Sequence, residues 1–387
     1  AIRANGGAST VNGGGGGGGR IAVLYDTAAQ AALPLPELSY AANGGASLGA
    51  DATFGDIGTL YFPDARFLGE TITWPGQWVI PGLDAWSPAS LTVSNAWIRF
   101  PADGFAYAVA GDVVVTGPNG RLDIGGMHYD PGEGRGMAAG ERPQRLSAGG
   151  GLELRGGASL YVYAAVTSGI PGEAQTSVEI GGDMRLASNC WIYPRCHNEC
   201  GAIPFFAADR LFVAAGGGFN ADAHGFKKVR GFMVSGRGPG RGKGASTQGG
   251  GGAGYGGKGG MNTGVYGQTY GCSNAPVYAG SSGGNRDNPP GGNGGGGVCI
   301  RVQGLAELAG TLTAKGQTES GGGGSGGSIF LRAGLFRAGP GAVVNAGGGA
   351  STATTGGGGG GGRVAVWSGV RPVEEALLLA GAPEAVR

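Results

Sequence analysis

Short segments in which apolar and polar residues alternate recur through the middle of the chain. In 121–124 (Arg-Leu-Asp-Ile) and 177–180 (Ser-Val-Glu-Ile), every second residue is apolar. Such alternation is typical of a β-strand that buries one face and exposes the other. Further segments of this kind, separated by Gly, Asn or Pro, lie at 112–115, 151–154, 159–163 and 210–213. The pattern therefore predicts many short strands and almost no helix before the C-terminal tail.

A glycine run followed by an apolar strand is repeated along the chain. The run 13–19 precedes Arg-Ile-Ala-Val-Leu, and the run 356–362 precedes Arg-Val-Ala-Val-Trp. Two intermediate runs, ending at 297 and 327, also precede apolar strands, so successive runs end 30 residues apart (297 to 327) and 35 residues apart (327 to 362). A period of this size predicts a solenoid.

These patterns together predict an all-β chain folded as a right-handed parallel β-helix with stacked glycine-rich arches. In such a fold each coil buries its apolar face only when neighbouring coils stack on it. We divide the chain into 1–80, glycine-rich coils; 81–205, regular short-strand coils with a cysteine-containing excursion at 185–205; 206–370, glycine-rich coils; and 371–387, a C-terminal tail.

Glycine accounts for 92 of the 387 residues, more than three times the roughly 7% of ordinary proteins. Glycine tracts are commonly flexible linkers. Here, however, each run ends immediately before a strand, and a linker has no reason to keep step with the coils. We therefore expect the runs to be ordered, with main-chain hydrogen bonds between neighbouring glycine segments.

The repeats resemble the glycine-rich repeat regions of very large secreted or surface proteins of bacteria. The similarity is carried by the glycine–arginine–strand units at both ends, by 58–62, 252–260 and 321–329, and by Leu-Ala-Glu-Leu-Ala-Gly-Thr-Leu-Thr-Ala at 305–314. It covers about 1–80 and 205–370. Those regions are predicted to be β-solenoids, and they look like adhesion or scaffold segments, so the resemblance implies a structural or adhesive role.

Charge and hydropathy narrow the partners. The 27 Lys and Arg residues nearly balance the 26 Asp and Glu residues, without a block of like charge, so we expect no nucleic-acid ligand. No apolar stretch approaches the length of about 20 residues that spans a membrane, and we expect no membrane insertion. The chain starts without an initiator Met or an apolar signal segment, which fits an exported protein whose signal is removed or lies outside this sequence.

Five cysteines supply the sharpest local cluster. Cys190, Cys196 and Cys200 lie within one short segment, and Cys272 and Cys299 follow. Crowded cysteines are typical of disulfides in an oxidising compartment, so we expect at least one bridge among these five and a location outside the cell or on its surface. A zinc site that includes His197 is the alternative, but the C-x5-C-x3-C spacing matches no familiar zinc motif.

Candidate chemistry is sparse, and we expect no enzyme, cofactor or metal. A polysaccharide lyase or hydrolase on this fold needs clustered carboxylates, whereas Asp112, Asp123, Glu153 and Glu179 are scattered singly. Exposed aromatic residues are the candidates for contacts with surface glycans, with coil packing as the alternative. They are Trp86, Trp97, Trp191 and Tyr193.

The sequence thus predicts an extracellular structural protein that self-associates head to tail into a fibre, sheath or filament. The first repeat begins at residue 5, without a capping segment before it, and the same unit recurs at 348–367. Open ends of a solenoid are templates for another chain. The tail 373–380 is expected to form a short helix that either caps the C-terminal end or docks onto the next subunit. The other candidates are a carbohydrate-binding module of the adhesin or phage-fibre type and a polysaccharide-acting enzyme.

Overall fold

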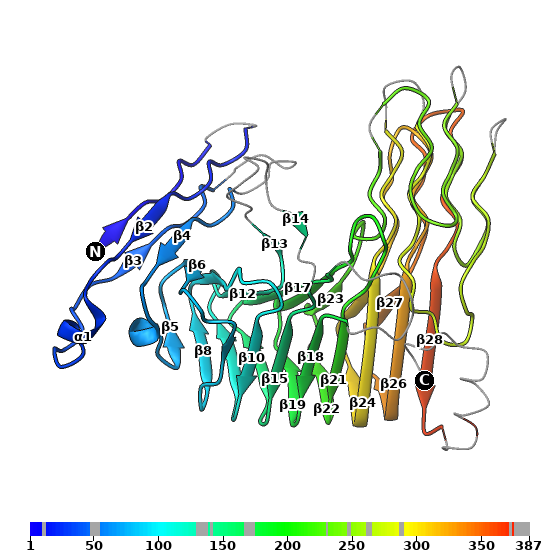
Figure 1. Cartoon of the computed structure of the whole chain (residues 1–387). Coiled ribbons are helices and arrows are strands. Elements are labelled where there is room, and N and C mark those ends of the chain that lie inside the picture. The colour runs from blue at the N-terminus through cyan, green and yellow to red at the C-terminus, as the bar shows by residue number, and fades with distance from the viewer. Residues whose placement is uncertain are drawn as a thin grey trace.

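The computed structural model describes residues 1–9, 13–46, 55–128, 138–139, 142–165, 175–229, 231–245, 249–260, 265–285, 290–370 and 374. Parallel strands stacked side by side form most of the molecule (Figure 1). The helical elements are short: α1 (Thr27–Gln30) and the 3-10 turn η1 (Ala65–Phe67). The expected all-β parallel β-helix is confirmed. The tail 371–387 lies outside the described residues apart from Glu374.

Two long parallel sheets wrap around one core. One is a ten-stranded sheet made of β2 (Arg20–Ala22), β4 (Thr59–Tyr61), β6 (Gly76–Val79), β9 (Trp97–Arg99), β12 (Arg121–Ile124), β17 (Ser159–Tyr163), β20 (Trp191–Arg195), β23 (Gly218–Asn220), β25 (Thr311–Thr313) and β27 (Val343–Asn345).

The fourteen-stranded sheet contributes two rows of strands to the coils. One row is β5 (Thr71–Ile72), β8 (Leu91–Ser94), β11 (Val113–Thr116), β16 (Leu152–Arg155), β19 (Asp183–Leu186) and β22 (Arg210–Val213). The other is β7 (Ala85–Trp86), β10 (Ala106–Val109), β15 (Arg145–Ala148), β18 (Ser177–Ile180) and β21 (Phe205–Ala208). Three longer strands then span both rows: β24 (Gly297–Leu308), β26 (Ser328–Ala338) and β28 (Arg363–Ser368).

Two small pairs complete the β-structure. β1 (Ile2–Arg3) pairs in parallel with β3 (Tyr40–Ala41). β13 (Met127–His128) pairs in antiparallel fashion with β14 (Ala138–Ala139).

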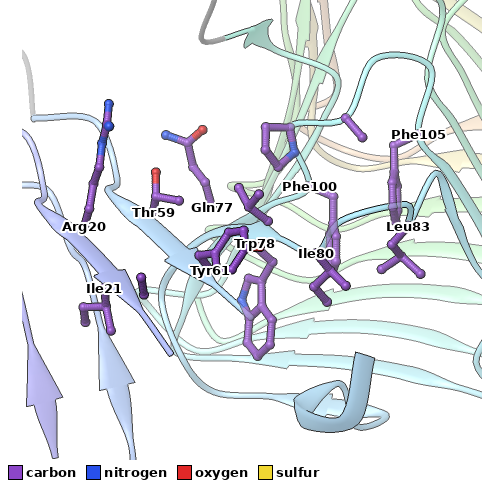
Figure 2. Close-up of a pocket in the computed structure, with 14 residues that line it drawn as sticks. Arg20, Ile21, Thr59, Tyr61, Gln77, Trp78, Ile80, Leu83, Phe100 and Phe105 are labelled. Atoms are coloured by element: carbon purple, nitrogen blue, oxygen red, sulfur yellow. The ribbon is translucent and has the colours of Figure 1, made fainter. Parts of the chain in front are cut away.

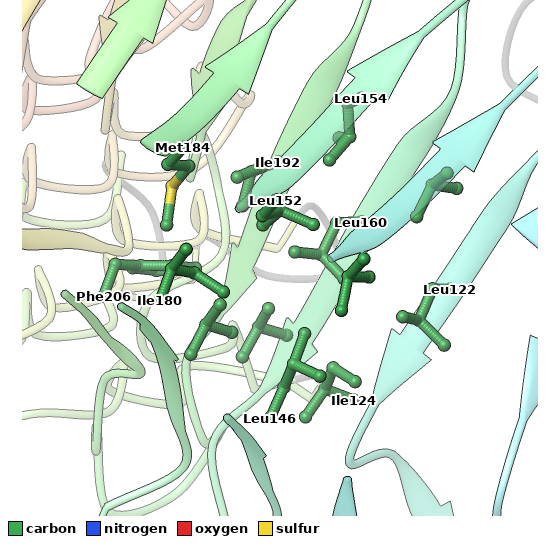
Figure 3. Close-up of a cluster of buried hydrophobic side chains, with 14 of the residues drawn as sticks. Leu122, Ile124, Leu146, Leu152, Leu154, Leu160, Ile180, Met184, Ile192 and Phe206 are labelled. Carbon is green, nitrogen blue, oxygen red and sulfur yellow. The ribbon is translucent and has the colours of Figure 1, made fainter. Parts of the chain in front are cut away.

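Each complete coil contains three strands, and its inward-facing residues form the core. β15, β16 and β17 make one such coil, and β18, β19 and β20 make the next. The register step between them is 32 residues on every side: Leu146 to Val178, Leu152 to Met184 and Leu160 to Ile192. All six side chains are buried, and Figure 3 shows the core of these coils. Because side chains of a strand alternate between its two faces, the same register that stacks these apolar residues places polar and aromatic residues outside.

The glycine-rich segments leave the coils as long excursions. Segments 314–327 and 346–362 connect successive strands, and 221–296 is inserted between β23 and β24. In Figure 1 these segments rise together above β24, β26 and β28. They belong to neither long sheet, yet their amides and carbonyls are extensively hydrogen-bonded to one another. The expected hydrogen bonding between glycine segments is confirmed, including in the runs 13–19 and 356–362.

The hydrogen bonds of segment 321–327 repeat every three residues. Amides three apart donate to the same neighbouring segment, and amides one apart donate to different ones. The donor–acceptor pairs are Gly322 to Gly284 and Ser325 to Ser281; Gly323 to Gly357 and Gly326 to Gly360; Gly324 to Gln317 and Gly327 to Ala314. A repeat of three residues without internal hydrogen bonds is that of the polyproline II conformation, so the segments form a laterally bonded bundle.

Three further segments donate to the carbonyls of 321–327, which places this segment in the middle of the bundle. The donors are Gly292 to Gly322, Ala253 to Gly323 and Gly349 to Gly324. Every residue of 321–327 is buried. Glycine is required there because a Cβ atom at Gly324 would lie 1.9 Å from the carbonyl oxygen of Asn293. Direct backbone contact on every side therefore explains the glycine content.

A second apolar cluster joins the insertion to the β-helix. Cys299 and Phe330 point outward from β24 and β26, and Ala275 and Ala279 of the insertion pack with them. The outer face of these strands is thus covered, in contrast to the outer face of earlier coils. This explains the uninterrupted apolar runs at 298–300 and 329–331, because strands covered on both faces lose the alternation.

The two ends of the core differ. At the N-terminal end, Ile72 and Trp78 are almost fully buried, and the partly buried Phe67 and Trp74 pack on this end of the core. The ring of Trp74 stacks on that of Trp78 with centroids 5.8 Å apart. The expectation of an uncapped first coil is therefore wrong, because segment 62–75 lays aromatic rings over that end. At the C-terminal end, apolar residues of β28 are exposed.

Candidate binding face

The outer face of the ten-stranded sheet carries a buried ion cluster. Asp123 on β12 is fully buried and accepts from Arg99 Nη2 at 2.8 Å and from Arg121 Nε at 2.6 Å. Arg99 on β9 also contacts Asp56 at 3.1 Å. Burial alone would raise the pKa of Asp123, but the two guanidinium groups lower it below its ordinary value. Burial alone would lower the pKa of Arg99, but Asp123 and Asp56 raise it.

Aromatic rings continue outward from this cluster across adjacent strands. The guanidinium of Arg121 lies 3.7 Å from the ring centroid of Trp97 and 3.6 Å from that of Tyr161. Tyr161 stacks on Tyr193 of the next coil with centroids 4.5 Å apart. Arg121 also donates to the hydroxyl of Tyr163 at 3.1 Å. Cation–π and ring stacking contacts of this kind favour flat, pre-organised arrangements.

Arg195, the last residue of β20, stands at the end of this arrangement. Its guanidinium lies 5.0 Å from the ring centroid of Tyr161 and 5.3 Å from that of Tyr193. Its Nη1 atom is buried and has no hydrogen-bond partner in the part of the chain that the structure describes. Together, Trp97, Arg121, Tyr161, Tyr163, Tyr193 and Arg195 form what we call the arginine–aromatic strip.

The structure brings together three of the four aromatic residues that the sequence singled out. Trp97, Trp191 and Tyr193 lie on the same outer face, and the rings of Trp191 and Tyr193 are 6.5 Å apart. Trp86 lies elsewhere, on β7, where it packs against the core with its ring 5.7 Å from that of Phe100.

Sequence reasoning missed the arginines and the two tyrosines of β17. Tyr161 is in register with Asp123 on one side and with Tyr193 on the other, and Tyr163 is in register with Arg195. An alignment of 159–163 with 191–195, one coil later, would have placed these residues on one face. The repeat of 32 residues was the available signal.

An apolar groove lies on the N-terminal part of the same sheet (Figure 2). Its volume is about 490 Å³, and Tyr61 and Trp78 are among its lining residues. Arg20, Thr59 and Gln77 lie side by side along its edge, because the three are in register on β2, β4 and β6. The groove and the strip thus share the ten-stranded sheet.

The fourteen-stranded sheet carries charged residues on its outer face. A shallow depression of about 360 Å³ is lined there by Asp112, Glu153 and Asp183, among others. Asp183 accepts from Arg185 at 2.5 Å and from Arg210 at 2.7 Å. Burial raises its pKa slightly, but these hydrogen bonds lower it overall. A general acid in a glycosidase needs the opposite shift, so this depression gives no support to the enzyme alternative.

The expected disulfide is not present, and this prediction is corrected. All five cysteines lie among the described residues, and all are thiols. Cys190 packs in the main core, while Cys196 and Cys299 are buried in the second cluster. Residues 191–195, expected within an excursion, form β20 of the regular sheet. The cysteines therefore serve as small apolar residues, and they no longer argue for export.

Cys200 is partly exposed, and its Sγ lies 3.1 Å from Nδ1 of His197. Among the described residues, no three His, Cys, Asp or Glu side chains are grouped closely enough to hold a metal ion. In that same part of the chain, no helix combines the length and the apolar character of a membrane span.

The fold defines the protein as a parallel β-solenoid with a glycine bundle. Comparison with protein families, with curated proteins and with solved structures finds no match.

Proposed function

We propose that the chain is an extracellular structural protein, a subunit of a surface fibre, sheath or filament that assembles by end-to-end stacking. The supporting observation is the C-terminal end of the core. Val364 continues the core row of Val298 and Ile329, both of which are fully buried, yet Val364 is 46% exposed. Val366 is 37% exposed. The surface location rests on the resemblance of the glycine repeats to secreted proteins.

The N-terminal arm of a second copy is the proposed occupant of this end. β28 pairs only with β26, and β2 pairs only with β4, so each end of the described chain carries a strand with one unpaired edge. Ile2 and Leu24 on the arm are exposed apolar residues. Stacking the arm on β28 would pair both edges and cover Val364 and Val366, contributing about 1 kcal/mol for each half-exposed valine as well as the strand hydrogen bonds.

Assembly of the full chain tests this proposal. Sedimentation velocity and negative-stain microscopy are expected to show concentration-dependent polymers of rod-like subunits. Replacing Val364 and Val366 together by Lys places two charges in the contact and is expected to leave monomers. Gln303→Lys, an exposed position on the side of β24, is the matched control and should still polymerise. A wild-type chain that stays monomeric at high concentration contradicts the proposal.

A second candidate is a carbohydrate-binding module of the adhesin or phage-fibre type, and the arginine–aromatic strip favours it. The C–H faces of sugar rings stack on aromatic rings, and the strip presents rings from adjacent coils at the spacing of about 4.8 Å between strands. Binding to a glycan array is the direct test. Tyr193→Leu, which removes a ring and retains bulk, should weaken any binding that uses the strip.

A further inference from the structure

The charges of the strip are unevenly compensated. Arg99 and Arg121 both contact Asp123, and Arg99 contacts Asp56 as well. Arg195 has no carboxylate partner within the described residues, and its Nη1 atom is buried without a hydrogen bond. A buried charged donor without a partner is destabilising. A group of this kind is retained where an incoming ligand supplies the missing acceptor.

The surroundings of Arg195 offer no anion of their own. His224 lies near it, and burial, followed by the charges of Arg195 and Lys227, lowers the pKa of His224 to about 3. The imidazole is therefore neutral at physiological pH. Lys227 is exposed and, among the described side chains, forms no ion pair. This corner of the strip thus carries two positive charges without a described carboxylate to balance them.

We propose that Arg195, flanked by the ring faces of Tyr161 and Tyr193, is the subsite that recognises the acid group of an acidic saccharide. This inference rests on the second candidate function, saccharide binding at the strip. A guanidinium binds a carboxylate or sulfate through two parallel hydrogen bonds, and the adjacent tyrosines hold the sugar ring that carries the acid. Nucleic acid does not fit, because its affinity depends on many phosphate contacts and this corner offers only two cations.

The experiment compares two ligands that differ only in charge. Binding of polygalacturonate and of its fully methyl-esterified form to the full chain is measured by calorimetry. The acid form is expected to bind about tenfold or more tightly, the difference that a charge-assisted hydrogen bond supplies. Arg195→Gln should reduce binding of the acid form to the level of the ester. Arg155→Gln, on the outer face of the fourteen-stranded sheet and 3.5 Å from Glu153, should bind like the wild type.

Stability measurements separate ligand recognition from a structural role of Arg195. Arg195→Gln is expected to melt at the same temperature as the wild type or higher, because it removes an unpartnered buried donor. Polygalacturonate should raise the melting temperature of the wild type and leave that of Arg195→Gln unchanged. A large loss of stability in Arg195→Gln would mean that the guanidinium is structural, and would overturn the inference.

The outcomes also distinguish this inference from the function on which it rests. Equal binding of the two polymers, unaffected by Arg195→Gln but weakened by Tyr193→Leu, would refute the acid subsite and leave saccharide binding in place. Failure of both polymers and of a glycan array to bind would refute saccharide binding itself, and the acid subsite with it.

Discussion

Adding one methyl group at two glycines of the bundle should change stability in opposite directions. At Gly324 a Cβ atom would lie 1.9 Å from the oxygen and 2.5 Å from the carbon of the Asn293 carbonyl. Real Cβ atoms essentially never approach closer than 3.0 Å, so the two segments must separate by about 1 Å. Overpacking of this kind costs about 1–3 kcal/mol, and each backbone hydrogen bond that is lost adds about 0.5–1.5 kcal/mol. Gly324→Ala should therefore destabilise the chain by about 2–4 kcal/mol.

Gly361 is the matched control in the neighbouring segment. A Cβ atom there meets nothing within 4 Å, and the backbone is outside the left-handed region. Gly361→Ala should stabilise by about 0.4–1 kcal/mol, because alanine restricts the unfolded chain. Guanidinium unfolding of the two variants and the wild type, followed by circular dichroism, gives the comparison. Equal shifts in the same direction would refute the packing argument, since both substitutions have the same effect on a disordered linker.

Two further predictions concern the buried charges and the thiols. Asp123→Asn should destabilise the chain by about 3–5 kcal/mol, because it leaves Arg121 and Arg99 in a buried site without their shared carboxylate; Asp183→Asn, in an exposed ion pair, should cost at most about 1 kcal/mol, and equal losses in chemical denaturation would contradict this. Since the pKa of Asp123 is lowered by folding, its stabilisation is present above the unfolded value of about 3.9 and is lost as the pH falls below it, so the wild type should lose more stability than Asp123→Asn on acidification. At pH 8 a thiol reagent should label Cys200 and Cys272 quickly, whereas Cys196 and Cys299, whose pKa burial raises to about 12, should react only after unfolding; fast labelling of Cys196, located by peptide mapping, would show that the second cluster is open.

The sequence was sufficient to predict the architecture because its strongest signals are periodic. Alternation at 121–124 and 177–180 reports inward and outward faces, and both segments are strands with that burial. The phase of the glycine runs predicted that they are ordered. It did not predict a bundle, because the three-residue repeat of hydrogen bonds leaves no trace in a run of identical glycines.

The cysteines and the ends show what sequence alone does not determine. Whether Cys190 or Cys196 forms a bridge depends on where its side chain points, and both point into apolar clusters. The aromatic cover at the N-terminal end was missed because Phe67 and Trp74 follow the first repeats in sequence yet pack back onto that end of the core. The strip was only partly visible, since Arg121 and Tyr161 come together through a register that single-strand patterns do not report.

Amide hydrogen exchange across 321–327 tests the central claim, that the glycine runs are a hydrogen-bonded part of the fold. Every amide from Gly322 to Gly327 donates to a neighbouring segment, so this segment should exchange as slowly as the core strand β24, when both are followed by mass spectrometry of the intact fold. Complete exchange of 321–327 within seconds, beside a protected β24, would contradict the claim and identify the glycine runs as linkers.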